Sequence, residues 1–82
     1  MPDMEDVRQI LATNMRLARI AAGISQEELA HRAGIDRTYV SGIERGKRNP
    51  TITVVARFAE ALGTTTADLL ARGIYAGIDN QR

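Results

Sequence analysis

The sequence predicts an all-α protein built from short helices. Apolar residues recur at the three- and four-residue spacing that places them on one face of a helix. Serine, threonine and aspartate precede these stretches where helix caps are expected, and glycines follow them. The only strand-like stretch, residues 51–55, alternates too briefly to indicate a sheet. We therefore expect a bundle of helices around one small core.

The first two helices have clear ends in the sequence. The first is expected from about residue 5 to 22, before Gly23, with an apolar stripe of Val7, Leu11, Met15, Ala18 and Ala22. The second is expected over residues 26–33. The Ser25 hydroxyl can accept the backbone N–H of Glu28 while the Glu28 carboxylate reaches back, which makes a capping box. Gly34 then tolerates the left-handed conformation that ends the helix.

The remaining helices are shorter or less regular. Asp36 caps a third helix that runs to about residue 45 and ends at Gly46. Residues 47–50 form a loop, because a proline at position 50 biases the residue before it away from helix. A fourth helix opens at residue 51 or 52, and a weaker capping box at Thr65 starts a fifth segment. The fourth helix has one apolar face, formed by Val55, Phe58, Ala59 and Leu62.

The size and composition indicate one small domain. A chain of 82 residues buries roughly 60–65% of its unfolded surface. We treat residues 1–82 as a single domain, with a core of about 7–72 and a tail, 73–82, that is flexible or contacts a dimer partner. There is no cysteine, and no apolar run approaches the roughly 20 residues that span a bilayer. Residues 1–6 are acidic and lack the apolar stretch of a signal peptide, so we expect a cytoplasmic protein without membrane contact.

The charge is unevenly distributed along the chain. The formal net charge is only +1, but residues 37–57 carry five basic side chains against the single acid Glu44. Several acids lie elsewhere, at Asp3, Glu5, Asp6, Glu27 and Glu28. A local basic stretch matters more for nucleic-acid binding than the total charge.

Residues 26–45 meet the steric conditions for two helices that cross steeply after a tight turn. The first helix needs a small residue at the crossing, and the turn needs a residue free to take positive φ. Ala30 and Gly34 supply these. The second helix needs apolar residues facing inward, and Val40 and Ile43 lie three apart. This combination predicts a central helix-turn-helix motif.

The segment Ser25-Gln26-Glu27-Glu28-Leu29-Ala30, then Gly34 and Ile43-Glu44-Arg45-Gly46, resembles the lambda-repressor-like family, also called the Xre or Cro/C1-type helix-turn-helix family. The resemblance covers about residues 15–70. Residues 36–45 with Arg48 and Asn49 more narrowly resemble the controller proteins of restriction–modification systems. The resemblance implies a five-helix domain whose third helix enters the major groove, as a homodimer on a two-fold symmetric operator.

The resemblance also implies roles for individual residues. Arg37 lies at the exposed start of the third helix, where its guanidinium can donate to both acceptors of a guanine. A surface arginine can also contact phosphate alone. The other candidate base readers are Thr38, Tyr39 and Ser41. Gln26 at the start of the second helix is expected to contact a phosphate, as are the residues that follow the third helix: Arg45, Lys47, Arg48 and Asn49. The unusual mid-helix glycine, Gly42, suggests close approach of DNA or of another backbone.

Two further predictions concern the structure of the protein rather than its contacts with DNA. In the family, residues at the positions of Arg19 and Glu44 form a partly buried ion pair between the first and third helices, and we expect the same pair here. The apolar residues near the C-terminal end suggest core packing together with a dimer interface, for which the candidates are Leu69, Leu70, Ile74 and Tyr75.

Other classes of function have less support. His31 is the only histidine, no cysteine accompanies it, and no glycine-rich phosphate loop is present, so we expect no enzyme, no cofactor and no metal. A protein-interaction module on the same fold is a second alternative, supported by the modest net charge. Within the regulators, a stand-alone or phage-type repressor is the alternative to a controller protein. RNA polymerase is a further candidate partner, and the sequence leaves open whether the protein activates or represses.

Overall fold

The computed structural model describes residues 6–73, which form five α-helices and no strand. The helices are α1 (Val7–Ala22), α2 (Gln26–Ala33), α3 (Arg37–Glu44), α4 (Ile52–Leu62) and α5 (Thr66–Leu69). The predicted all-helical class and the helix order are confirmed, and the briefly strand-like stretch is the start of α4. None of the described helices is long and apolar enough to cross a membrane.

Each helix begins at a polar side chain that accepts a backbone N–H of the first turn. The caps are Asp6, Ser25, Asp36, Thr51 and Thr65. Such caps satisfy N–H groups that have no partner within the helix. The capping box predicted for α2 is only half formed. The Glu28 carboxylate accepts from Arg32 Nε at 2.7 Å instead of reaching back to residue 25, because a charged partner one turn on is the stronger donor.

The turn between α2 and α3 depends on Gly34. Its φ of +69° lies in the left-handed region, where a side chain is disfavoured. This geometry lets the backbone N–H of Ile35 return to the carbonyl of Ala30 at 2.9 Å. The chain therefore leaves α2 sharply, and only three residues, 34–36, separate α2 from α3.

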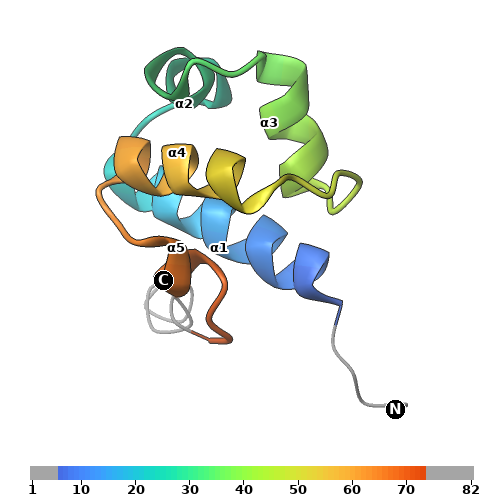
Figure 1. The fold of residues 1–82 in the computed structure, drawn as a ribbon. Coiled ribbons are helices and arrows are strands. Elements are labelled where there is room, and N and C mark those ends of the chain that lie inside the picture. The colour runs from blue at the N-terminus through green and yellow to red at the C-terminus, as the bar shows by residue number, and fades with distance from the viewer. Residues whose placement is uncertain (1–5, 74–82) are drawn as a thin grey trace.

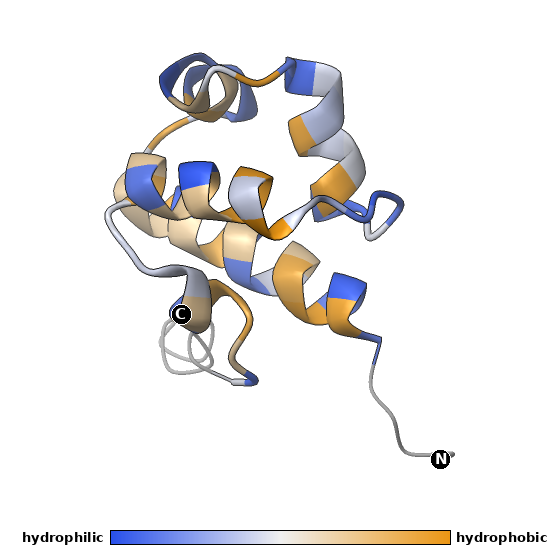
Figure 2. Ribbon diagram, viewed as in Figure 1, coloured by the Kyte–Doolittle hydropathy of each residue, from blue (hydrophilic) through white to orange (hydrophobic). Residues whose placement is uncertain are grey.

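The core lies where the apolar faces of the helices meet. Figure 2 shows that α1, α3 and α4 each carry both hydrophobic and hydrophilic residues, as expected of helices with one buried face. The crossing residue Ala30 and the inward residues Val40 and Ile43 are all buried. The core cluster also contains Leu11, Met15, Ala18, Leu29, Ala33, Val55, Phe58, Ala59 and Leu69.

The position of α3 leaves one of its sides uncovered. In Figure 1, α2 and α3 lie on one side of α1 and α4, and α5 lies on the other side. α3 packs against α2 and α1, whereas α5 packs against α4 and α1. The helix-turn-helix therefore forms one end of the bundle, with the outer side of α3 open.

Leu69 belongs to this chain's own core. The side chain is fully buried among α1, α4 and α5, so it offers no surface to a second subunit. Its prediction as a dimer contact is therefore wrong, because an apolar residue in a short C-terminal helix can serve either purpose and here packs inward. Leu70 is half-buried and lines a shallow apolar groove with Val7, Leu11 and Ile52. Ile74 and Tyr75 lie outside the described residues.

A buried asparagine joins the two ends of the described fold. Asn14 in α1 is 3% exposed. Its side-chain amide donates to the backbone carbonyls of Leu69 (2.8 Å), Ala71 (2.7 Å) and Asp68 (3.3 Å). The last carbonyls of a helix have no partner within it. Asn14 therefore ends α5 and fastens it to α1.

We expect Asn14→Leu to lower the free energy of unfolding by about 2 kcal/mol, because leucine of similar size leaves buried carbonyls without a donor. Urea unfolding followed by circular dichroism measures the change. Thr13→Ala, at the exposed neighbouring position, is the control and should unfold like the parent. A parent-like midpoint for Asn14→Leu would show that water replaces the amide at no cost.

Candidate nucleic-acid interface

The outer side of α3 carries the predicted base-reading residues. Arg37 and Thr38 are exposed, and Tyr39 and Ser41 are half-buried. The opposite side of the helix packs into the core. Arg37 makes no hydrogen bond or ion pair with any residue between 6 and 73. Its guanidinium is therefore available to an external acceptor.

The start of α3 is fixed by Asp36. Its carboxylate accepts from the Thr38 backbone N–H at 2.9 Å and from the Thr38 hydroxyl at 2.7 Å. The hydroxyl hydrogen bond, followed by the backbone one, lowers the pKa of Asp36 below its usual value. Because the hydroxyl hydrogen is committed to Asp36, Thr38 can offer a ligand only its methyl group and its remaining acceptor capacity.

Ser41 and Arg45 are coupled one turn apart. Arg45 Nη1 donates to Ser41 Oγ at 2.9 Å, and Arg45 is exposed. The hydroxyl of Ser41 thereby orients an arginine at the end of α3. The guanidinium keeps other N–H donors for a phosphate.

A polar loop follows α3 and lies beside it. Lys47, Arg48 and Asn49 are all exposed, and Figure 2 shows the loop after α3 as hydrophilic. The guanidinium carbon of Arg48 lies 5.2 Å from the centre of the Tyr39 ring, which is a cation–π distance. The space beside Gly42 is taken by the Arg48 side chain, so the expected close approach of another backbone at this glycine is not observed.

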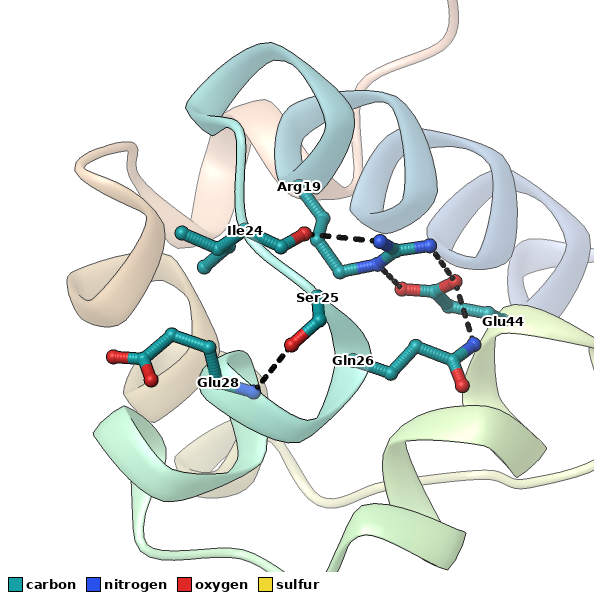
Figure 3. Close-up of polar contacts among 6 residues, drawn as sticks. All are labelled: Arg19, Ile24, Ser25, Gln26, Glu28 and Glu44. Atoms are coloured by element: carbon teal, nitrogen blue, oxygen red, sulfur yellow. Dashed lines mark hydrogen bonds and ion pairs between the residues drawn. The ribbon is translucent and has the colours of Figure 1, made fainter.

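An ion pair ties α1 to the end of α3. Arg19 Nε and Nη2 donate to the two carboxylate oxygens of Glu44 at 2.8 and 3.0 Å, and Nη1 donates to the Ile24 carbonyl at 3.0 Å. Figure 3 shows the guanidinium between these groups. The side chains are 16% and 4% exposed. The hydrogen bond that Arg19 donates to the Glu44 carboxylate raises the pKa of Arg19 above its usual value. The structure thus brings together the two residues of the predicted pair.

Gln26 joins the same cluster. Its amide nitrogen donates to Glu44 Oε1 at 3.1 Å, which connects the start of α2 to the end of α3 (Figure 3). An amide has two hydrogens, so one remains for the phosphate predicted at this position. The contact with Glu44 was not foreseen from the sequence, and it fixes where that second hydrogen points.

Two further contacts also escaped the sequence analysis. Gly46, which follows α3, has a φ of +72°, and the Gln9 side chain of α1 lies directly against it. Asn14 fastens α5, as described above. Gln9 and Asn14 belong to no motif, and their partners are far away in the sequence. Only the general rule that a buried amide needs partners could have drawn attention to Asn14.

The described residues contain no group of three or more histidine, cysteine or acidic side chains placed to hold a metal ion. His31 is exposed on α2. The chemistry gathered at α3 is instead that of hydrogen-bond donors and positive charge around an exposed helix. These groups suit a nucleic acid, in which the phosphates are negatively charged and the base edges offer hydrogen-bond donors and acceptors.

This architecture defines a class of DNA-binding regulators rather than of enzymes. The helix-turn-helix family model matches residues 15–69, and the chain belongs to this family, of the lambda-repressor-like (Xre) type. It is 49% identical over 70 residues to a hypothetical transcription factor of Neisseria meningitidis serogroup B, a match covering 85% of this chain and 66% of that protein. It is 41% identical over 76 residues to control protein C.SmaI of Serratia marcescens, covering 88% and 90% of the two chains.

Solved structures agree with this assignment. The crystal structure of the Neisseria factor matches with a TM-score of 0.79 and 44% identity, over 84% of this chain and 82% of that one. The restriction–modification controller protein C.AhdI of Aeromonas hydrophila matches with a TM-score of 0.73 and 39% identity, over 76% and 94%. C.Esp1396I, solved as a tetramer with its natural 35 base-pair operator, gives 0.73 and 30%, over 80% and 87%.

Proposed function

We propose that this protein is a sequence-specific DNA-binding transcriptional regulator that reads its operator with α3 in the major groove. The observation that carries the proposal is the exposed polar side of α3. Arg37 at its start has no hydrogen-bond or ion-pair partner among residues 6–73, and a basic loop lies beside the helix. An α-helix fits the major groove, where each base pair shows a distinct pattern of donors and acceptors. Selection of bound duplexes from a random pool tests this function directly.

The interface divides into two sets of contacts. The base edges meet the outer side of α3, through Arg37, Thr38, Tyr39 and Ser41. The phosphates on either side meet the start of α2 and the loop after α3, through Gln26, Arg45, Lys47, Arg48 and Asn49. Phosphate contacts place the helix on the duplex, while base contacts determine the sequence.

The phosphate contacts predict a strong dependence on salt. Each neutralised phosphate releases counterions, so affinity falls steeply as salt rises. We expect Lys47→Ala to weaken binding to all duplexes about equally and to reduce the slope of log K against log salt by about 1. Fluorescence anisotropy at several salt concentrations measures this.

The matched control for Lys47→Ala is Arg72→Ala, which removes one positive charge three residues past α5. In Figure 1, α5 lies on the opposite side of α1 and α4 from α3. Its salt slope should equal that of the parent. A salt-independent affinity of the parent would favour the alternative reading, a protein-interaction module on the same fold.

We further propose that the protein acts as a homodimer on a two-fold symmetric site and controls restriction–modification genes. The relatives named control proteins, and the operator complex of C.Esp1396I, support this assignment. On this proposal residues 1–82 act in the cytoplasm as one domain without cofactor, and RNA polymerase is a further partner. A selected motif without two-fold symmetry would contradict the dimer. Genes for an endonuclease and a methyltransferase next to the gene of this protein would support the controller. Their absence would favour a stand-alone or phage-type repressor.

A further inference from the structure

Gly42 makes room for the side chain of Arg48. This glycine is buried in the interior of α3. A Cβ built on it would lie 2.6 Å from Cγ of Arg48, 3.1 Å from Nε and 3.4 Å from Cδ, and these are its three nearest neighbours. Real Cβ atoms essentially never show contacts under 3.0 Å. Any other residue at position 42 therefore requires Arg48 to move.

Tyr39 contacts the same arginine from one turn earlier in α3. We call the place on α3 between Gly42 and Tyr39, where the Arg48 side chain lies, its seat. Residues 39 and 42 are three apart on α3, and residues with this spacing are neighbours on a helix surface. The Arg48 guanidinium carbon lies 5.2 Å from the centre of the Tyr39 ring. The backbone N–H of Lys47 donates to the Gly42 carbonyl at 2.9 Å, which holds the start of the loop against the helix. The arginine from the loop thus lies across α3.

We propose that Gly42 is a positioning residue for DNA recognition, which seats Arg48 on α3 so that its guanidinium reaches the duplex already ordered. The inference rests on the DNA-binding function proposed above. An arginine that is free in solution loses rotamer freedom when it binds, and a seated one has lost much of it beforehand. The seat also makes an arginine of the loop part of the reading surface of α3.

The proposal predicts opposite effects on stability and on binding. Glycine is a poor residue for a helix interior, so alanine at position 42 favours α3 itself. The atoms that an alanine would displace belong to a flexible, exposed side chain and not to the core. Gly42→Ala should therefore melt at the parent's temperature or above it, yet bind DNA less well.

A double-mutant cycle tests the proposal. Gly42→Ala, Arg48→Ala and the double variant are compared by thermal unfolding and by affinity for a duplex selected with the parent protein. We expect Gly42→Ala to bind about three- to tenfold more weakly, the effect of freeing one long side chain. Arg48→Ala should lose at least as much. In the Arg48→Ala background, Gly42→Ala should cause no further loss, because the side chain that it displaces is absent.

Two results would overturn the inference. One is parent-like DNA affinity for Gly42→Ala. The other is an equal loss of affinity from Gly42→Ala whether or not Arg48 is present, which would mean that the methyl group disturbs the interface by itself. Failure of the parent protein to select or bind any duplex would instead refute the proposed function, so the two failures are distinguishable.

Discussion

Replacing Glu44 by alanine is expected to lower the free energy of unfolding by about 3 kcal/mol, the cost of leaving a buried charge without its partner. Arg19 would lose both of its bonds to the carboxylate and keep only the Ile24 carbonyl. Gln26 would also lose its acceptor. Since one kcal/mol shifts the melting temperature of a domain of this size by about 4–8 °C, the change should exceed about 10 °C.

The same variant should keep the parent's DNA sequence preference, because Glu44 faces the cluster between α1, α2 and α3 and not the outer side of α3 (Figure 3). The control is Glu28→Ala, which removes an exposed ion pair with Arg32 and should leave the melting temperature nearly unchanged. Equal melting temperatures for parent and Glu44→Ala would show that the ion pair contributes nothing to stability.

The largest effect on function is expected from Arg37→Ala. A bidentate arginine–guanine contact discriminates by about 1–3 kcal/mol, and a dimer on a symmetric site makes the contact twice. The affinity for the selected operator should therefore fall by roughly two to four orders of magnitude, with one base position relaxed in each half-site. Competition with operators substituted at single positions measures both quantities.

Arg37→Lys separates base reading from charge. Lysine retains the positive charge but lacks the planar fork that matches both acceptors of guanine. This variant should preserve the salt dependence of binding and lose most of the discrimination at the same base position. Uniform weakening of all sequences by Arg37→Ala would mean instead that Arg37 only grips the DNA backbone.

The parts of the fold that could be predicted are those determined locally. Ser25 and Gly34 mark the two ends of α2 through bonds to residues only a few positions away. The helix-turn-helix follows because its small, left-handed and apolar residues must stand in one register, which a short stretch of sequence contains completely. The pair of Arg19 and Glu44 spans a longer separation and was expected only from the resemblance.

The parts that escaped prediction depend on the path of the chain in space. Asn14 bonds carbonyls more than fifty residues away, and no local pattern specifies such a partner. Gly42 leaves space for the side chain of Arg48, and this is visible only in the structure, where the loop after α3 lies beside the helix. Leu69 shows a third limit, because an apolar residue looks the same in a sequence whether it fills its own subunit or meets another.

The inward position of Leu69 has a consequence for how such a regulator responds to dilution. Within residues 6–73, α5 of the same chain closes the hydrophobic core, so the buried apolar side chains are covered without a second subunit. If the protein acts as the homodimer proposed above, we expect its dissociated subunits to stay folded on dilution, because their buried apolar side chains remain covered.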